Sequence, residues 1–433
     1  MSLPWKFDPL GVSGAPVSVY GVEYDPSSSS PACQRIILRG GTAQNVASFD
    51  RLPAHHFKRC VMDDLATRHI NYYLDPLDST KKLNGAAADL TGADGDVMVE
   101  IPIVHWKVET LTNGHIRWLV SDHAFAGSEI HPFFYVSPDG QTARTQYVGA
   151  YDATICDANG DRIANMMNEA ATSSTAYNAA YKLRSVAGCK PFTSTTLGRL
   201  RTTARNNGGE VCNSLFYQFL GLMMLIEGAS LNTQATISEG FAYATTWSFA
   251  YLRLAGRVNA GNGTAEALAD ATQDAAITWQ VNHAKHVIAF QYRGIENPYG
   301  AASQFEEGIQ KWDDGSSNPS TACYWWTAAT NNYTDTDQNA ASSPTYTKTL
   351  HAWPRANGVV QTFDPRSFLP LTIGASASTY MCDGYGYDNA TGSRILLRGG
   401  ATGNTTNAGA WYVYAAYALN SGVFGVNGAR ISA

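Results

Sequence analysis

The feature that most constrains this chain is an uncharged segment between two short apolar strands near its C-terminal end. The first expected strand, Arg394–Arg398, exits through Arg-Gly-Gly, and the second, Val423–Ile431, contains Gly-Ala-Arg. Residues 399–422 between them are mainly Asn, Thr, Tyr, Trp, Ala, Ser and Gly, with no charged residue and no cysteine. Rigid aromatic rings combined with small amides and hydroxyls are typical of binding surfaces. The sequence therefore predicts a displayed surface whose two ends are fixed by framework strands.

Ten side chains of this segment are candidate ligand contacts, because they offer ring area or hydrogen-bonding groups. They are Thr402, Asn404, Thr406, Asn407, Trp411, Tyr412, Tyr414, Tyr417, Asn420 and Ser421. Side chains alternate between the faces of a strand, so Tyr412 and Tyr414 are expected on one face and Val413 on the other. Exposure is expected for Tyr412, Tyr414, Tyr417, Asn404, Asn407 and Asn420, and burial for Leu396, Val413 and Val426. The alternative is a tyrosine-rich edge strand without a ligand.

The protein surface is expected to be polar but weakly charged. Charged residues make up 15% of the 433 residues, against about 25% in an average soluble protein. The net charge of −6 gives no electrostatic reason to expect nucleic acid as a partner. No stretch approaches the roughly 18 apolar residues of a membrane span, and no secretory signal is visible at the start. A protein made in the cytoplasm that acts outside the cell fits a virion component released by lysis.

No metal, cofactor or catalytic motif is predicted. The seven cysteines are odd in number and contain no Cys-x-x-Cys pair, so we expect them to be reduced and mostly buried. Other side chains that could bind a metal or exchange protons are interpreted as structural or solvated, because they lack further partners at suitable spacing. These are His55-His56 with Cys60, His283 with His286, Asp63-Asp64 and Glu306-Glu307. Nucleophile, zinc-protease and phosphate-binding motifs are absent from the sequence.

Hydrophobic periodicity predicts an α+β protein, with sheets on either side of a pair of central helices. The expected strands include 96–109, which Pro102 interrupts, 116–120, 133–136 and 147–153. A helix capped by Thr195 or Thr196 is expected over 197–207, and a buried helix capped by Asn213 or Ser214 over 214–229. Residues 313–350 are polar and predict a long loop or an insertion.

Several short blocks in a fixed order resemble one family. The blocks are Gly21–Ser28, Phe57–Cys60, Val97–Pro102 with Trp106–Val108, Gly294–Gly300 followed by Phe305 and Gly308-Ile309, and the C-terminal LRGG, NAG and GAR. Together they resemble phage tail proteins with a C-type lectin-like domain, which share a fold with formylglycine-generating enzymes. The family includes variable proteins of diversity-generating retroelements and phage tropism determinants. The chain departs from the family at 301–303, where Asn-(Ile/Val)-Trp is replaced by Ala-Ala-Ser, and at Thr402, where the family has Trp.

The resemblance implies a C-type lectin-like fold and a division of the chain into two parts. Residues 1–90 are expected to form a β-rich N-terminal segment for assembly or attachment. Residues 91–433 are expected to form a C-type lectin-like ligand-binding domain, with insertions at about 230–285 and 313–385.

The function that the resemblance implies is that of a non-enzymatic adhesin in a phage tail fibre or tail tip, located in the virion. Its expected partners are a host cell-surface receptor, protein or glycan, and other tail proteins, with the chain forming a homotrimer. No nucleic acid, membrane insertion or cofactor is expected. One alternative is a structural virion hub whose C-terminal surface packs on a neighbour. A less favoured alternative is a formylglycine-generating-type oxidase, whose cysteine pair follows the Arg-Gly-Gly turn. No cysteine follows Cys382 in this chain.

Overall fold

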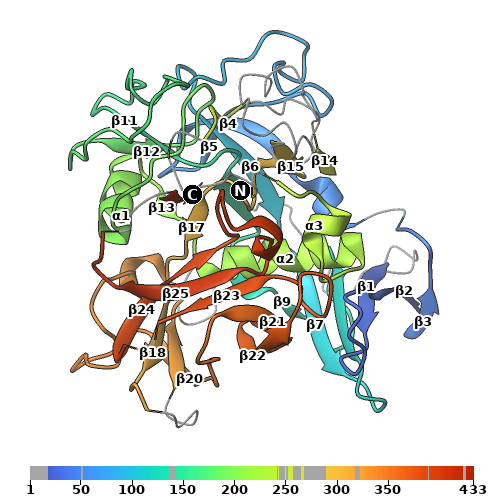
Figure 1. Cartoon of the computed structure of the whole chain (residues 1–433). Helices are drawn as coiled ribbons and strands as arrows, with labels where there is room; N and C mark the ends of the chain where they lie inside the picture. The colour runs from blue at the N-terminus through green and yellow to red at the C-terminus, as the bar shows by residue number, and fades with distance from the viewer. Residues whose placement is uncertain are drawn as a thin grey trace, which may run out of the picture.

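The protein is β-rich, with few helices (Figure 1). The computed structural model describes residues 18–49, 52–135, 142–240, 242, 249, 252–256, 265–267, 289–316, 322–388, 390–422 and 426–433. Its α-helices are α1 (Leu197–Asn206), α2 (Ser214–Gly228) and α3 (Thr233–Thr236). Its short 3-10 turns are η1 (Pro53–His56), η2 (Pro132–Phe134), η6 (Thr330–Asn332) and η7 (Thr405–Asn407).

The two expected helices and their caps are confirmed. The Thr196 hydroxyl accepts the Arg199 N–H at 3.2 Å at the start of α1, and the Asn213 side-chain oxygen accepts the Phe216 N–H at 3.0 Å at the start of α2. Such caps satisfy N–H groups that have no partner inside the helix. Most of α2 is buried, as its continuous apolar sequence predicts, and the helix crosses the middle of the molecule in Figure 1. No helix in the described part of the chain is long and apolar enough to cross a bilayer.

The structure contains two antiparallel six-stranded sheets, and the second of them combines early and late parts of the chain. The first has the order β3 (Thr42–Asn45), β2 (Gln34–Arg39), β1 (Val19–Tyr24), β8 (Ile116–Ser121), β7 (His105–Thr110), β9 (Glu129–Ile130). The second has the order β13 (Glu210–Val211), β27 (Ile431–Ser432), β10 (Thr145–Gly149), β6 (Asp96–Pro102), β4 (Lys58–Asp64), β5 (His69–Tyr73). Because β1 pairs with β8 and β4 with β6, both sheets cross the expected boundary at residues 90–91.

A ten-stranded sheet contains the C-terminal segment. Its main path is β20 (Thr347–Leu350), β19 (Cys323–Trp326), β18 (Ile309–Asp313), β24 (Gly392–Arg398), β25 (Val413–Ala418), β23 (Gly384–Tyr387), β21 (Gly358–Phe363), β22 (Pro370–Ala375). Two short strands, β17 (Ser303–Phe305) and β26 (Asn427–Gly428), complete it beside β24. Small sheets elsewhere are formed by β11 (Thr154–Cys156) with β12 (Lys182–Arg184), and by β14 (Ala265–Ala267), β15 (Phe290–Tyr292) and β16 (Ile295–Glu296).

Strand β24 lies between two hydrophobic clusters, which fixes the sheet from both sides. Leu396 belongs to the cluster that contains α2, whereas Ile395 and Leu397 belong to the cluster that contains α1 and β27. Six of the seven residues of β24 are buried. The strand that carries the Arg-Gly-Gly exit is therefore among the most constrained elements of the molecule.

Two expectations about local structure were wrong. Residues 133–136 do not begin as a strand: Pro132–Phe134 form the turn η2, where the His131 ring nitrogen Nδ1 accepts the Phe133 N–H at 3.2 Å. For residues 313–350 the long-loop alternative was wrong, because they supply β19 and β20 to the ten-stranded sheet, whereas the alternative of an insertion stays a prediction. At 132–134, Pro132 has a backbone angle that suits the start of a helical turn. This local preference outweighed the aromatic residues that suggested a strand.

Candidate ligand-binding surface

The Arg-Gly-Gly turn that opens the neutral segment is fixed against the Gly294–Gly300 block. The Gly300 N–H lies 3.2 Å from both the Gly399 and the Gly400 carbonyl oxygens. Gly399 and Gly400 have φ of 86° and 70°, a region that side chains disfavour. A Cβ on Gly399 would also lie 3.1 Å from the Cβ of Tyr299. Close backbone contact and positive φ together explain the glycine pair.

The Gly-Ala-Arg that closes the segment is fixed against the same block. Arg430 is 1% exposed, and its guanidinium donates to the Gly149 carbonyl at 2.8 Å, the Glu296 carbonyl at 2.7 Å and the Asp152 carboxylate at 2.7 Å. Burial raises the pKa of Asp152 to about 7, an effect that the Arg430 charge opposes. One arginine therefore joins the end of the segment to the ends of β10 and β16.

Glu306 and Glu307, expected on the surface, are instead buried partners of arginines. Glu306 pairs with Arg398 of the Arg-Gly-Gly turn, and Glu307 accepts from Arg201 of α1 at 2.8 Å. Burial raises the pKa of both carboxyl groups, that of Glu307 to about 7, and the arginines counteract this rise. Asp63 and Asp64 are exposed, as predicted.

The middle of the segment is fixed by the buried carboxylate of Asp383. This carboxylate accepts the Trp411 N–H at 2.7 Å, and burial raises its pKa well above the usual range. A Cβ on Gly409 would lie 2.3 Å from a carboxylate oxygen of Asp383, so a larger residue cannot occupy that position without displacing it. The Ala410 N–H donates to the Thr233 hydroxyl at 3.1 Å. The neutral segment is thus attached to the scaffold along its length.

Three of the ten candidate contacts are buried, so they offer no surface to a ligand in this structure, and the expected exposure of Tyr412 was wrong. Thr402, Trp411 and Tyr412 are 0%, 1% and 5% exposed. The Trp411 ring stacks on Phe368 with 4.2 Å between centroids. It also lies directly against α2, where a Cβ on Gly221 would come within 2.4 Å of the ring. Trp411 therefore fills the space between the ten-stranded sheet and the central helix.

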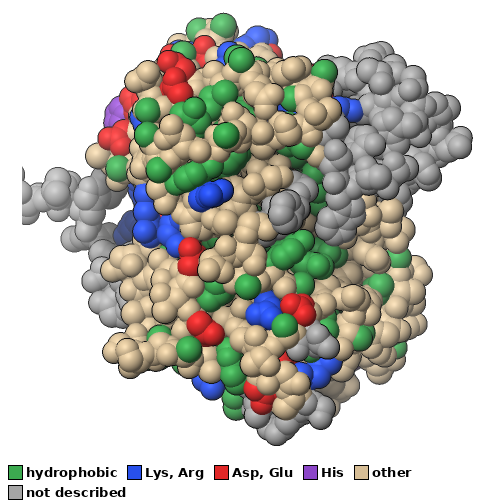
Figure 2. All heavy atoms as spheres, turned by 60° about the vertical axis from the view of Figure 1, so that its left-hand side comes forward, with side chains coloured by type: hydrophobic (Ala, Val, Ile, Leu, Met, Phe, Trp, Pro, Cys, Tyr) green, Lys and Arg blue, Asp and Glu red, His purple; other side chains and the backbone are tan. Residues whose placement is uncertain are grey.

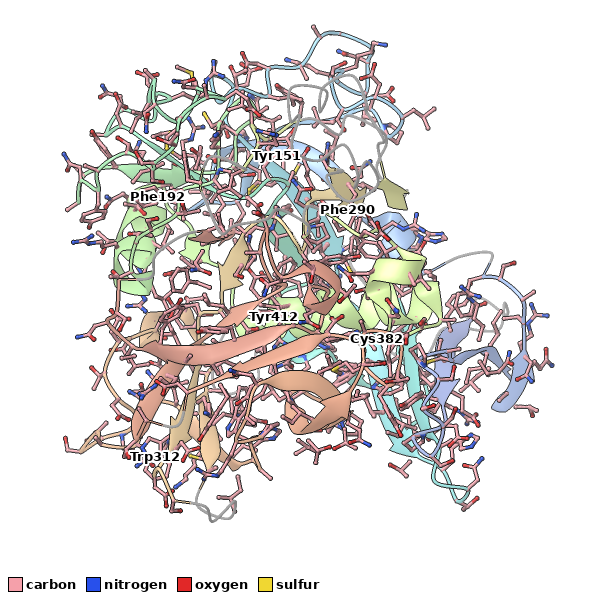
Figure 3. All side chains as sticks on the ribbon, viewed as in Figure 1. Tyr151, Phe192, Phe290, Trp312, Cys382 and Tyr412 are labelled. Atoms are coloured by element: carbon pink, nitrogen blue, oxygen red, sulfur yellow. The ribbon has the colours of Figure 1, made fainter. Side chains whose placement is uncertain are left out.

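Tyr412 was expected to share an exposed face with Tyr414, but the strand β25 begins only at Val413. Side chains alternate between two faces only within a strand. Tyr412 precedes β25, so this alternation does not determine its direction. Its hydroxyl accepts from the Asn404 side-chain amide at 3.2 Å. Figure 3 labels Tyr412 near the middle of the molecule in that view.

The other seven candidates reach solvent. Thr406, Asn407 and Asn420 are exposed, whereas Asn404, Tyr414, Tyr417 and Ser421 are half-exposed. We call these seven residues the recognition surface. The expected burial of Leu396, Val413 and Val426 is confirmed. Figure 2 shows one face of the molecule, on which uncharged side chains and backbone cover most of the surface and charged side chains are scattered, as the composition predicts.

An irregularity in β25 brings two tyrosines of the recognition surface together. Ile395 pairs with Tyr417 and Leu397 with Tyr414, so three steps on β25 oppose two on β24. This extra residue is a β-bulge, which shifts the alternation of side chains. The Tyr414 and Tyr417 rings consequently meet with 5.2 Å between centroids. Burial and the neighbouring Tyr414 raise the pKa of Tyr417.

All seven cysteines are free, and six of them are buried. Among the described residues, no group of three or more His, Cys, Asp or Glu side chains is placed to hold a metal ion. His283 and His286 lie outside the described residues. Comparison of the chain with protein-family models gives no match. Comparison with curated proteins gives no match either.

Proposed function

We propose that this protein is a non-enzymatic adhesin of a phage tail fibre or tail tip that binds a host receptor through the recognition surface. One observation carries the proposal: the blocks that resemble the phage family meet at both ends of the neutral segment. Gly300 bonds to the Arg-Gly-Gly turn, and Arg430 bonds to the Glu296 carbonyl. The order of strand, two helices and strands agrees with the C-type lectin-like fold that we propose. Because β1 pairs with β8 and β4 with β6, this fold includes strands that precede residue 91.

The fixed segment favours binding because it is ordered before contact. Binding to a rigid surface costs less conformational entropy than binding to a loop that must first become ordered. The rings of Tyr414 and Tyr417 supply amphipathic area, and Asn407 and Asn420 supply hydrogen-bonding groups. Seven neutral side chains give modest affinity at one site, so a homotrimer would strengthen attachment through avidity.

Replacing Tyr417 with Ala is expected to weaken binding to host cells by about 1–2 kcal/mol, because truncating an aromatic interface residue often costs that much. The measurement is adsorption of fluorescently labelled protein to a panel of bacterial strains, scored on the strains that the unmodified protein binds. Thermal unfolding of each variant shows whether the fold is retained.

Tyr181→Ala is a matched control. Tyr181 is also half-exposed and packs against the same hydrophobic cluster as Tyr417, but it lies outside the recognition surface. Equal loss of adsorption in both variants would contradict the adhesin function. If the assembled oligomer protects Tyr414 and Tyr417 from chemical labelling, the structural hub is favoured instead.

A further inference from the structure

The short helix α3 packs directly against the turn η7, which carries part of the recognition surface. The Gln234 side-chain amide donates to the Thr405 carbonyl at 3.0 Å. The Ala242 carbonyl accepts the Gly403 N–H at 2.9 Å and the Thr405 N–H at 2.8 Å. In Figure 1, α3 accordingly lies beside a turn of the red C-terminal part. The two segments are far apart in the sequence, but they form one continuous part of the molecule.

Both segments are attached to the Gly294–Gly300 block through Tyr299. The Tyr299 hydroxyl donates to the Ser238 carbonyl at 2.6 Å and accepts the Ser238 N–H at 3.3 Å, just beyond α3. The Cα and Cβ atoms of the same tyrosine face Gly399, where an added Cβ would lie 3.2 Å and 3.1 Å from them. Since one buried residue holds both segments, they are ordered before a ligand arrives, which lowers the entropic cost of binding.

The side chains that these two segments present to solvent are small, polar and uncharged. Thr405, Thr406 and Asn407 are exposed, and Asn404 and Gln234 are half-exposed. All five carry a hydroxyl or an amide, and Ala235 is exposed beside them. Neither α3 nor residues 399–422 contain a charged residue. We call residues 404–407 together with Gln234 and Ala235 the joint surface.

An uncharged glycan is the ligand that matches the joint surface best. Amide and hydroxyl side chains offer both donors and acceptors, and sugar hydroxyl groups do the same. A protein partner usually buries aromatic or arginine anchors at the centre of its interface, and the joint surface contains neither. A glycan with carboxylate or phosphate groups binds most strongly to arginine or lysine, which are also absent from this surface.

We propose that the joint surface is a subsite for an uncharged glycan of the host cell surface, with Gln234 and Ala235 as specificity-determining contacts beside Asn407. The inference rests on the proposed adhesin function, to which it adds a ligand class and a second contact element. It also gives a role to the first residues of the expected insertion at about 230–285, because α3 lies within that range.

The first test places a long cation on the joint surface. Ala235→Arg is expected to weaken adsorption to host cells at least about tenfold, because the added charge has no partner in an uncharged ligand. The melting temperature should stay unchanged, since arginine suits an exposed helical position. Ala87→Arg is the matched control, because Ala87 is exposed in the loop between β5 and β6, outside both the joint and the recognition surface. It should adsorb fully.

The second test identifies the ligand class and the contact. Treatment of host cells with periodate, which cleaves vicinal diols of sugars, should abolish adsorption of the unmodified protein, whereas treatment with proteinase K should not. Ala235→Cys should react with a maleimide in solution and be protected once the protein is bound to cells. Mass spectrometry of the peptide that contains residue 235 measures the labelling. Ala87→Cys should remain reactive in both states.

Three results overturn the proposal: full adsorption of Ala235→Arg, unchanged labelling at residue 235 on cells, or loss of adsorption after protease but not after periodate. The adhesin function survives each of them if Tyr417→Ala still weakens adsorption. Absence of adsorption to every strain would instead contradict the adhesin function, and the inference with it. If Ala235→Arg lowers the melting temperature, the protection of Ala235→Cys decides.

Discussion

Replacing Arg430 with methionine should lower the free energy of unfolding by about 3–5 kcal/mol, the usual effect of removing one partner of a buried ion pair. The variant leaves the Asp152 carboxylate buried without its arginine, and three carbonyl groups lose a donor. Without the opposing cation, the pKa of Asp152 should rise above its present value of about 7. Urea unfolding at several pH values measures both effects.

The pH dependence has a defined sign. A carboxyl whose folded pKa is raised contributes stability below its unfolded pKa of 3.8 and loses it as pH rises through the folded pKa. The free energy of unfolding that Arg430→Met loses relative to the unmodified protein should therefore be larger at pH 8 than at pH 5. The double variant with Asp152→Asn should recover part of the loss, because no unpaired charge remains buried. Equal stability of Arg430→Met and the unmodified protein would contradict the role given to this arginine.

Replacing Trp411 with alanine should lower the free energy of unfolding by about 3–5 kcal/mol, the range for truncating a large buried aromatic side chain. The ring fills the space between Phe368 and the backbone at Gly221, and neither can readily move to close the cavity. By contrast, Asn420→Ala should change stability by no more than about 0.5 kcal/mol, because that side chain is exposed. Thermal or urea unfolding of the two variants gives the comparison. If Trp411→Ala retained its stability but lost cell binding, Trp411 would be a ligand contact after all.

The sequence was sufficient for features that depend on local chemistry. The caps of α1 and α2 were predictable because a Thr or Asn directly precedes an apolar helical pattern. The break at Pro102 was predictable because proline lacks a ladder donor, and β6 ends at that residue. The burial of Val413 followed from alternation within β25.

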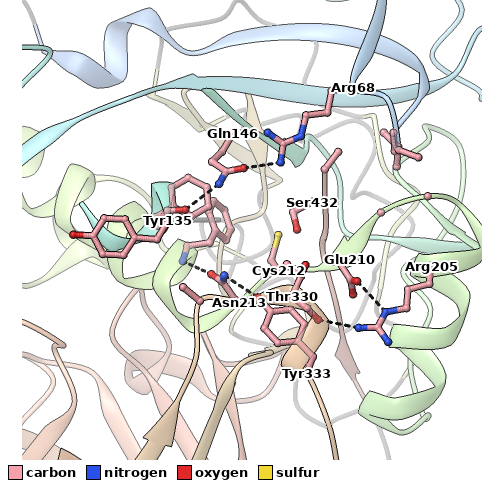
Figure 4. Close-up of a pocket in the computed structure, with 18 residues that line it drawn as sticks. Arg68, Tyr135, Gln146, Arg205, Glu210, Cys212, Asn213, Thr330, Tyr333 and Ser432 are labelled. Atoms are coloured by element: carbon pink, nitrogen blue, oxygen red, sulfur yellow. Dashed lines mark hydrogen bonds and ion pairs between the residues drawn. The ribbon is translucent and has the colours of Figure 1, made fainter. Parts of the chain in front are cut away.

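Features that depend on distant partners were not predictable in the same way. Glu306 and Glu307 looked solvated because Arg398 and Arg201 lie far away in the sequence. Their apolar neighbours Phe305 and Ile309 were the available signal, since a charged pair inside an apolar strand region requires partners. The burial of Trp411 could not be predicted without knowing that its ring packs against Gly221 of α2. A pocket lined by Leu65, Phe133 and Glu210 likewise depends on segments that meet only in the folded chain (Figure 4).

The position of β27 has a consequence for how the protein is made. This strand lies between β10 and β13, so the second sheet stays open until residues 431–432 have left the ribosome. Arg430 and its acceptor Gly149 are separated by 281 positions, and contacts of such long range are formed late and slowly. The scaffold therefore cannot be completed before the recognition surface has been synthesised. A nascent chain interrupted within that surface should expose unpaired strand edges, which makes it a target for chaperones or aggregation.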